Sequence, residues 1–306
     1  MLAVKESVAL APLTTFRIGG EARYFVEVKT EDQLREAVAW AKEKNVRSVI
    51  LAGGSNVLVP DEGIDGLVIR VALIDHSFAG NELAADAGCN LLGLIRESAE
   101  RNWGGWEKLA GIPGTIGGAA RGNAGAFGSE IRDIITKVRA FDTETGEMRE
   151  FENIVCDFSY RHSFFKDNPE WVITRAIIEL KPSQYDISYA LIEETIKERE
   201  KRHLQNVKAA GSFFMNPVAP QAIVDMFEKE KGVKSRESRV PAGWLIEKAG
   251  MKGAQVGGAI ASLQHPNYIV NTGTATANDV RTLADKIKDE VKKQFHITLQ
   301  EEATII

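Results

Sequence analysis

The feature that most constrains this chain is a concentration of glycine near its centre. Nine of its 27 glycines fall in the run GGWEKLAGIPGTIGGAARGNAGAFG, residues 104–128. Such a density is unfavourable inside ordinary helices and strands, because glycine loses more backbone freedom on folding than any other residue. Glycine also lets a ligand approach the main chain, so that peptide N–H groups can hold phosphate oxygens. The run predicts either a phosphate-binding cradle or a set of tight turns.

Another glycine cluster, the first along the chain, favours the cradle; the central run is the second cluster. The sequence AGGSN, residues 52–56, directly follows an expected buried strand, Ser48–Leu51, where ligand-binding turns often lie. Ser55 and Asn56 add side-chain donors to this turn. Neither cluster contains the GxGxxG of a Rossmann fold or the GxxxxGK[ST] of a P-loop. A nucleotide bound here would therefore be held in another way.

Hydrophobic periodicity predicts an α+β chain with several domains. Residues Tyr24–Lys29 alternate like a half-buried strand, and Thr30 with Gln33 forms a helix capping box. The helix that follows leads to the strand Ser48–Leu51 and completes a βαβ unit. The length of 306 residues exceeds that of a usual single domain. We expect domains over residues 1–65, 66–183 and 184–306, with a final strand at about 297–306 that can return to the first domain.

Further elements follow from the same patterns. Strands are expected at Leu67–Val71, Val138–Phe141 and Val172–Leu180. Helices are expected near Leu91–Arg101, Glu193–Arg202 and Pro220–Gly232. The last helix carries one apolar stripe, made of Val280, Leu283, Ala284, Ile287, Val291 and Phe295.

Composition and charge argue against several classes of protein. With 44% hydrophobic and 26% charged residues, the chain can bury a core and remain dissolved. The net charge of -5 gives no broad positive field for nucleic acid. The two cysteines, Cys89 and Cys156, support neither a disulfide framework nor a metal site. No segment resembles a membrane span or signal peptide, so we expect a cytoplasmic protein.

Four motifs together resemble a known family. They are TTFRIGG (14–20), AGGSNVLV (52–59), AGIPGTIGGA (110–119) and GNAGAFGSEI (122–131). The combination resembles the bacterial UDP-N-acetylenolpyruvoylglucosamine reductases. These are flavoenzymes of peptidoglycan precursor synthesis, and so of cell wall biogenesis, cell shape and cell division. The resemblance implies a two-subdomain FAD-binding fold of the vanillyl-alcohol-oxidase/PCMH type, followed by an α+β substrate-binding domain.

The resemblance places FAD at the two glycine clusters. Related flavoproteins attach the flavin covalently through a histidine in the first glycine turn. The turn of this chain, residues 53–56, contains no histidine, so we expect non-covalent FAD. The implied reaction passes hydride from NADPH through FAD to UDP-N-acetylglucosamine enolpyruvate and gives UDP-N-acetylmuramate. The absence of a second dinucleotide motif agrees with a family scheme in which NADPH and the sugar use one site in turn. The expected cofactor-binding residues are Gly53, Gly54, Ser55, Asn56, Ile112, Pro113, Gly114, Thr115, Gly117, Gly118, Asn123 and Gly125.

Three further motifs contain the expected catalytic residues: YRHSFFK (160–166), AGSFFMNP (210–217) and LQEEATII (299–306). By position in them, Arg161, Ser212 and Glu302 resemble the family's catalytic trio. Arg161 and Glu302 would polarise the substrate carboxyl group, and Ser212 would protonate the enolate carbon. Taken singly, they also fit an ion pair, a turn or cap, and a solvated edge carboxylate. Their occurrence together with the flavin motifs, in family order, favours the catalytic interpretation.

Other positions are expected to contact the substrate. Tyr189 resembles a substrate-covering tyrosine of one family subtype, whereas the run KEREKRHLQNVKAAGSFF, residues 197–214, resembles the other subtype, so the subtype stays open. Asn216, and His265 in the motif QHPNYIVN, fit ligand contacts and equally a turn asparagine and a packed histidine. The expected substrate-binding residues are Phe127, Tyr189, Asn216 and His265.

Three departures from the family pattern affect substrate anchoring. Met215 stands where a basic residue or glutamine is common, Phe127 where tyrosine is usual, and Thr304 where an arginine often follows the catalytic glutamate.

Two alternatives remain open: another FAD-dependent oxidoreductase of the same superfamily acting on a different sugar or alcohol, and a flavin-binding module without turnover. The sequence leaves the oligomeric state open, and a monomer is compatible with it.

Overall fold

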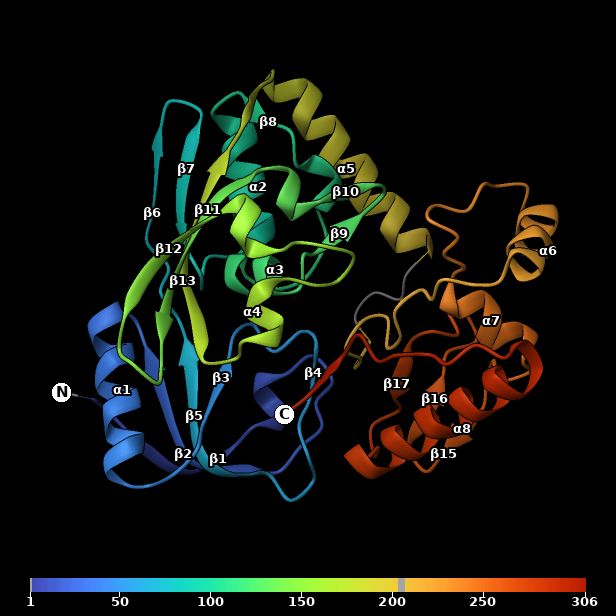
Figure 1. The fold of residues 1–306 in the computed structure, drawn as a ribbon, viewed down its shortest axis with the longest axis horizontal. Helices are drawn as coiled ribbons and strands as arrows, with labels where there is room; N and C mark the ends of the chain where they lie inside the picture. Colours follow the sequence, from blue (N-terminus) through green and yellow to red (C-terminus); the bar gives the residue numbers. More distant parts are fainter. Residues whose placement is uncertain (1, 203–206) are drawn as a thin grey trace. The chain divides into compact units, whose positions relative to one another are not determined.

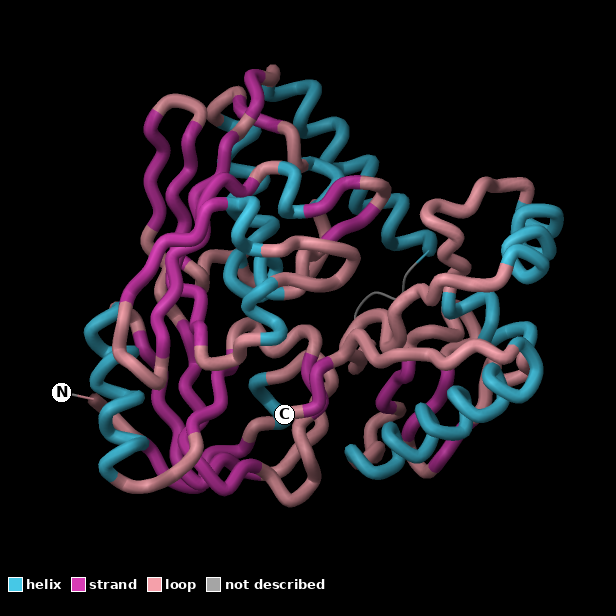
Figure 2. Tube along the Cα trace, viewed as in Figure 1, coloured by secondary structure: helices cyan, strands magenta, loops and turns pink. Residues whose placement is uncertain are grey.

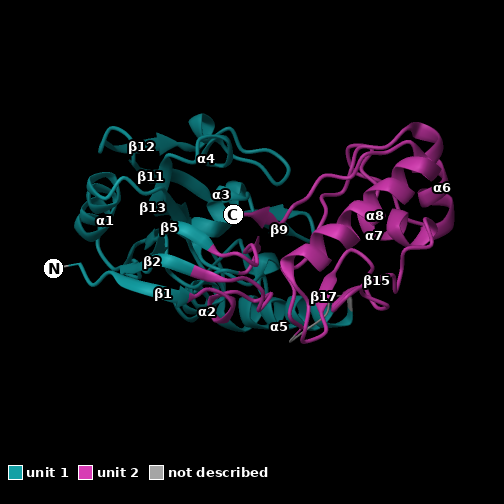
Figure 3. Cartoon of the chain, turned by 90° about the horizontal axis from the view of Figure 1, so that it is seen from below, with its two compact units in different colours: residues 1–8, 22–54, 64–201 teal, residues 9–21, 55–63, 202–306 magenta. Residues whose placement is uncertain are grey.

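The structure, a computed structural model, describes residues 2–202 and 207–306 (Figure 1). The chain forms two compact units, each with its own hydrophobic core (Figure 3). Unit 1 comprises residues 1–8, 22–54 and 64–201, and unit 2 comprises residues 9–21, 55–63 and 202–306. Early segments of the chain therefore contribute to both units.

The first sheet has the strand order β1-β2-β5-β3. Its strands are β1 (Lys5–Ala9), β2 (Glu21–Val28), β3 (Ser48–Leu51) and β5 (Ile64–Val71). The helix α1 (Glu31–Glu43) connects β2 to β3, and both strands run parallel to β5, which lies between them. The predicted βαβ unit is confirmed, with β5 inserted. The predicted cap also forms, since Thr30 Oγ1 accepts from Gln33 N at 3.1 Å.

The second sheet lies within unit 1 and has five antiparallel strands. In spatial order they are β12 (Met148–Glu152), β11 (Ile135–Asp142), β13 (Trp171–Glu179), β7 (Glu82–Asp86) and β6 (His76–Ala79). The predicted strands at 138–141 and 172–180 correspond to β11 and β13. Sequence patterns missed β6, β7 and β12, which are short.

Helices pack beside this sheet, and α3 lies against β13 (Figure 1). The helices of unit 1 after α1 are α2 (Leu91–Glu100), α3 (Ile116–Arg121), α4 (Phe164–Asp167) and α5 (Tyr185–Arg202). Smaller elements are β8 (Trp103–Gly104), η2 (Glu107–Leu109), β9 (Gly125–Ala126), β10 (Ser129–Glu130), η3 (Ile131–Asp133), η4 (Asn153–Cys156) and β14 (Lys181–Pro182). The side chain of Ile192, on α5, joins the unit 1 core. The expected three-domain division differs from these two units and stays a prediction.

One carboxylate joins α1 to the second sheet of unit 1. Glu31, at the start of α1, accepts hydrogen bonds from Arg139 Nε at 2.9 Å, Arg139 Nη2 at 3.1 Å and Thr174 Oγ1 at 2.8 Å. Burial alone would raise the pKa of Glu31, but the bonds from Arg139 and Thr174 outweigh it and lower the pKa below its ordinary value. The carbonyl of Thr174 accepts from Ala87 N at 2.8 Å, beside the second glycine cluster.

Unit 2 combines helices with a three-stranded antiparallel sheet (Figure 2). Its elements include η1 (Ala11–Leu13), α6 (Gln221–Lys231), α7 (Ala242–Lys248), β15 (Gln255–Val256), β16 (Ala259–Ala261), β17 (Ile269–Asn271) and α8 (Ala277–Phe295). The predicted stripe of α8 is buried from Val280 to Val291. Asp61 caps this helix by accepting from Ala277 N at 2.7 Å and Asn278 N at 3.0 Å.

The C-terminal residues return to an early segment of the chain. β18 (Thr304–Ile305) pairs in parallel with β4 (Val57–Leu58). The strand predicted over residues 297–306 is thus shorter than expected, because the residues before it make only a single bridge, between Glu301 and Phe214. Within residues 2–202 and 207–306, no helix is long and apolar enough to cross a membrane.

Glu31→Gln is expected to lower the free energy of unfolding by about 1 kcal/mol near neutral pH, a small value because the ion pair is partly exposed. The carboxylate has a lowered pKa in the folded state. Its contribution is therefore present above the unfolded-state pKa and is lost as the pH falls through the folded-state pKa. The difference from the wild type should shrink between about pH 6 and about pH 3 in urea unfolding experiments.

Glu36→Gln is the matched control, since Glu36 is an exposed carboxylate on the same helix. It should change the free energy of unfolding by less than about 0.5 kcal/mol. Equal losses in both variants, or a Glu31→Gln effect that does not depend on pH, would contradict the role assigned to Glu31.

Candidate active site

The two glycine clusters meet in unit 1. Gly53 follows β3 and faces the turn before α3, where a Cβ added to Gly53 would lie 3.3 Å from Gly114 Cα and 3.4 Å from Thr115 Cγ2. Gly54 (φ 66°) and Gly114 (φ 127°) adopt backbone conformations that favour glycine. Two predicted cofactor-binding turns, far apart in the sequence, are thus brought together.

A short segment after β7 supports the second cluster. Ala87 O accepts from Gly117 N at 2.9 Å, and Cys89 O accepts from Ile116 N at 3.0 Å. A Cβ on Gly117 would lie only 2.7 Å from Ala87 Cβ, so packing inside the protein requires glycine there. A contact between Gly117 and a cofactor stays a prediction.

Asn123 fixes the loop after α3 from within. Its side chain is fully buried and its backbone is left-handed, with φ 41°. Its Nδ2 donates to Ser159 O at 2.8 Å and to Glu130 Oε2 at 3.1 Å, and its Oδ1 accepts from Arg132 N at 3.3 Å. Because the protein itself uses the amide, Asn123 shapes the loop, and a direct bond to a cofactor stays a prediction.

Arg161 lies against the end of the second glycine cluster. Its Nη2 donates to Gly125 O at 2.8 Å, and its own carbonyl accepts from Lys166 Nζ at 3.0 Å. Gly125 opens the β9–β10 hairpin, whose two turn residues are Phe127 (φ 51°) and Gly128 (φ 81°). The structure therefore groups Arg161, Gly125 and Phe127 on one side of unit 1.

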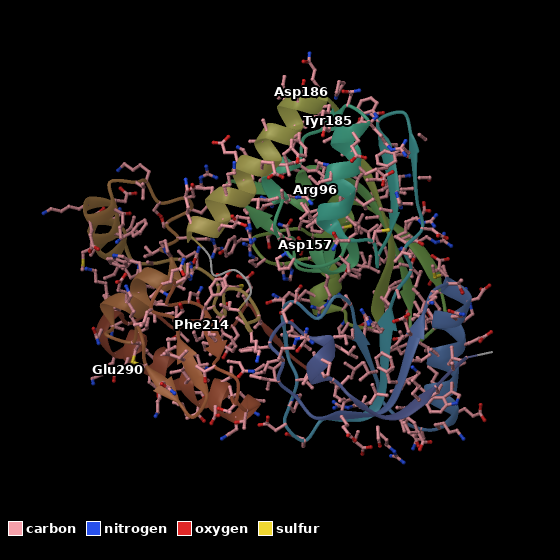
Figure 4. The ribbon with its side chains drawn as sticks, turned by 180° about the vertical axis from the view of Figure 1, so that it is seen from behind. Arg96, Asp157, Tyr185, Asp186, Phe214 and Glu290 are labelled. Carbon is pink, nitrogen blue, oxygen red and sulfur yellow. The ribbon has the colours of Figure 1, made fainter. Side chains whose placement is uncertain are left out.

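Ser212 and Glu302 lie on neighbouring segments of unit 2. Glu302 N donates to Phe213 O at 2.8 Å, directly after the serine. Phe213 and Phe214 are each 1% exposed and anchor this segment in the core; Figure 4 labels Phe214. Within the part of the chain that the structure describes, the Ser212 hydroxyl makes no hydrogen bond. Ser212 is half-buried, and its contact with a substrate stays a prediction.

Asn56 ties the first glycine turn to the Glu302 segment. Its Nδ2 donates to Glu302 O at 3.1 Å, and its backbone carbonyl accepts from Thr304 N at 3.0 Å. Both bonds lie within unit 2, whereas Gly53 and Gly54 belong to unit 1. The peptide bond between Gly54 and Ser55 therefore joins the two units in the middle of the turn.

The remaining predicted substrate residues are dispersed. Tyr189 lies on α5 in unit 1, is 43% exposed and stacks on Tyr185, with 5.4 Å between ring centroids. Asn216 and His265 belong to unit 2. Asn216 Oδ1 accepts from Ala242 N at 3.0 Å and so caps α7, while burial lowers the pKa of His265. Their contacts with a substrate stay predictions.

Sequence reasoning missed two polar residues that hold the Ser212 segment. Thr15 Oγ1 lies 2.8 Å from Ala209 O and 3.3 Å from Ser55 O. Asn267, which is 2% exposed, bonds the backbone of Phe214. Both residues occur inside motifs that were recognised, but which backbone they contact depends on long-range folding.

The two clusters fit a dinucleotide cofactor. Gly118 is exposed, and a Cβ there would meet nothing closer than Thr115 Oγ1 at 3.7 Å and Ala52 Cβ at 4.0 Å. The backbone at Gly53 and Gly118 is therefore accessible because side chains are absent, and glycine amides of this kind can approach phosphate oxygens. Residues present here could hold FAD through main-chain donors, with Ser55 adding a hydroxyl.

Comparisons with known proteins assign both parts of the chain. Residues 22–152 match the family described as "FAD binding domain", and residues 202–306 match "UDP-N-acetylenolpyruvoylglucosamine reductase, C-terminal domain". A curated UDP-N-acetylenolpyruvoylglucosamine reductase from Synechococcus sp. is 34% identical over 99% of this chain and 91% of its own length. One from Anoxybacillus flavithermus is 36% identical, covering 99% of this chain and 94% of its own length.

A solved structure agrees over the full length. The crystal structure of UDP-N-acetylenolpyruvylglucosamine reductase from Thermus caldophilus is 30% identical, covers 100% of this chain and 99% of its own, and has a TM-score of 0.79. The expected α+β fold, with an FAD-binding domain followed by a reductase C-terminal domain, is confirmed. The chain therefore belongs to the UDP-N-acetylenolpyruvoylglucosamine reductase family and is an FAD-dependent oxidoreductase.

Proposed function

We propose that this chain reduces UDP-N-acetylglucosamine enolpyruvate to UDP-N-acetylmuramate, with NADPH as hydride donor and non-covalent FAD as carrier. The observation that carries the proposal is the bonding of the Ser212 segment to Glu302, and of Glu302 to Asn56 in the glycine turn. The proposal includes a role in peptidoglycan precursor synthesis, as the family resemblance implies, and a cytoplasmic location.

The cofactor-binding part of the proposal uses main-chain donors. The turn Gly53–Asn56 and the residues around Gly114 and Gly118 would hold the FAD diphosphate. The turn contains no histidine, cysteine or tyrosine to form a covalent bond with the flavin. When bound, FAD supplies the hydride chemistry by accepting hydride from NADPH and passing it to the substrate.

Ser212 is the proposed proton donor. Addition of hydride to the terminal carbon of the enolpyruvyl double bond leaves an enolate, whose neighbouring carbon must gain a proton. The Ser212 hydroxyl donates that proton, and its lack of a partner within the described residues supports this role. Serine is a weak acid, but the enolate carbon is a strong base, and a positioned donor supplies roughly 10²- to 10⁴-fold in rate.

Arg161 and Glu302 are proposed to act on the substrate carboxyl group. A guanidinium has five N–H donors, and the bond from Arg161 Nη2 to Gly125 O uses one of them while fixing the side chain. A cation at the carboxyl group stabilises the charge that develops on the enolate. Glu302 is held by its own backbone, through Phe213 O and Asn56 Nδ2.

An anaerobic two-step experiment tests this function. The FAD-loaded protein is reduced with NADPH, and the enolpyruvyl UDP-sugar is then added while flavin absorbance is followed. The proposal predicts loss of absorbance in the first step and its return in the second. A flavin that NADPH does not reduce would indicate a binding module, and a reduced flavin that responds only to another sugar or alcohol would indicate a different oxidoreductase.

Ser212→Ala should separate the two half-reactions. We expect reduction of the flavin by NADPH to remain within about twofold of wild type, and reoxidation by the enolpyruvyl sugar to slow by roughly 10²- to 10⁴-fold. Stopped-flow absorbance measures both rates. Reoxidation at a normal rate would end the proton-donor role of Ser212.

Gly118→Ala should weaken FAD binding without harming the fold. The added methyl group meets no protein atom closer than 3.7 Å, and alanine is favoured over glycine in a helix by roughly 1 kcal/mol. The apoprotein should therefore keep or slightly raise its melting temperature, while a titration of FAD should show weaker binding.

Gly93→Ala on α2 is the matched control, because Gly93 is an exposed helical glycine outside both clusters. It should leave FAD affinity unchanged. If Gly118→Ala also binds FAD normally, the cofactor does not approach this face of α3.

A further inference from the structure

A buried asparagine holds the backbone that directly follows Ser212. Asn267 lies just before β17 and is 2% exposed. Its carbonyl accepts from Phe213 N at 2.7 Å, its Oδ1 accepts from Phe214 N at 2.9 Å, and its Nδ2 donates to Phe214 O at 2.8 Å. One residue thus makes three hydrogen bonds to the two residues after the serine.

The same segment is bonded on its other side by the C-terminal residues. Glu302 N donates to Phe213 O at 2.8 Å, and Met215 N donates to Gln300 O at 2.9 Å. The segment therefore lies between Asn267 and residues 300–302, in the position of a middle strand. The amide side chain of Asn267 replaces the peptide group that a third strand would offer.

An asparagine meets this requirement because one amide group carries both an acceptor and a donor. Phe214 is buried, so its N–H and C=O have no access to bulk water if the side chain is truncated. On the other flank of the serine, Gly211 has φ 75°, and an added Cβ would meet no described atom within 4 Å. Before Gly211 the chain is held by Thr15, which donates to Ala209 O at 2.8 Å, and directly after Ser212 it is held by the bonds to Phe213 and Phe214.

We propose that Asn267 is a positioning residue for the proton donor. Asn267 fixes the backbone of Phe213 and Phe214, and through that backbone it orients the Ser212 hydroxyl. The inference rests on the proposed function, since it requires Ser212 to protonate the substrate. Loss of the Asn267 amide should slow reoxidation of the flavin by the enolpyruvyl sugar, because that step uses the Ser212 hydroxyl. It should spare reduction of the flavin by NADPH, which does not use the hydroxyl.

A double-mutant cycle in the FAD-loaded, full-length protein tests this. Wild type, Asn267→Ala, Ser212→Ala and the double variant are reduced with NADPH and then mixed with the enolpyruvyl UDP-sugar, and each rate is recorded. Asn267→Ala should slow reoxidation by about 10- to 100-fold and leave reduction within about threefold. In the Ser212→Ala background, the same change should slow reoxidation by less than about threefold, because the hydroxyl is already absent.

Asn271→Ala is the matched control for loss of a buried amide. Asn271 is 6% exposed, and its side chain bonds Phe16 O at 3.1 Å and Gly273 N at 2.8 Å. Asn271→Ala should lower the melting temperature, and it should not slow reoxidation of the flavin more than reduction. If Asn267→Ala loses the fold, Asn267→Asp replaces it, since it keeps an oxygen for Phe214 N and exchanges the donor for a carboxylate oxygen that repels Phe214 O. It should show the same pattern, with slowed reoxidation and nearly normal reduction of the flavin.

The positioning role would be overturned if Asn267→Ala and Asn271→Ala slowed reoxidation equally. It would also be overturned if the slowing in the double variant equalled the product of the factors for Asn267→Ala and Ser212→Ala. Failure of the proposed function has a different signature. In that case Ser212→Ala would be reoxidised at the wild-type rate, or the wild-type flavin would not respond to the enolpyruvyl sugar.

Discussion

The close approach of two glycine backbones is the constraint on which the site depends. Gly53 and Gly114 come so near that a Cβ on the first would lie 3.3 Å from the second. The segment that begins at Ala87 accepts hydrogen bonds from backbone amides of the second cluster. Ala87 N in turn donates to Thr174 O, and the Thr174 hydroxyl donates to Glu31. The fold of unit 1 thus produces a surface of main chain without side chains, which is suited to phosphate.

A second constraint lies in unit 2, where a short segment carries the serine between two partners. Asn267 bonds it on one side and the Glu302 segment on the other. Asn56 bonds the Glu302 segment and belongs to the same turn as Gly53. Within unit 2, the serine segment, the acid and Asn56 are therefore linked by backbone bonds and two side-chain amides, so their arrangement does not depend on flexible, exposed side chains.

Periodicity predicted the local elements of this fold well. β2, α1, β3 and α8 lie where the apolar patterns indicated. The two helices were the clearest, because each has a continuous buried face and a recognisable N-cap. The insertion of β5 between β2 and β3 could not be predicted, since strand order depends on contacts between distant segments. β7 was missed because its sequence, ELAAD, has no clear alternation of large apolar residues.

The site was predicted unevenly for similar reasons. Glycine density indicated the cradle, and the family motifs indicated Arg161, Ser212 and Glu302. No sequence pattern separates Gly117, which packs on Ala87, from Gly118, which is exposed, because only the fold determines which side of α3 is covered. Asn267 was missed because a buried amide is recognised by the backbone it bonds, and that backbone is distant in the sequence.

The most direct test of the central claim is a crystal structure of the FAD-loaded protein with the enolpyruvyl UDP-sugar bound. The account predicts FAD diphosphate oxygens within hydrogen-bonding distance of the amides around Gly53 and Gly114. It also predicts Ser212 Oγ within about 3.5 Å of the substrate carbon that is protonated. A diphosphate bound away from both glycine clusters, or a different proton donor at that carbon, would contradict the account.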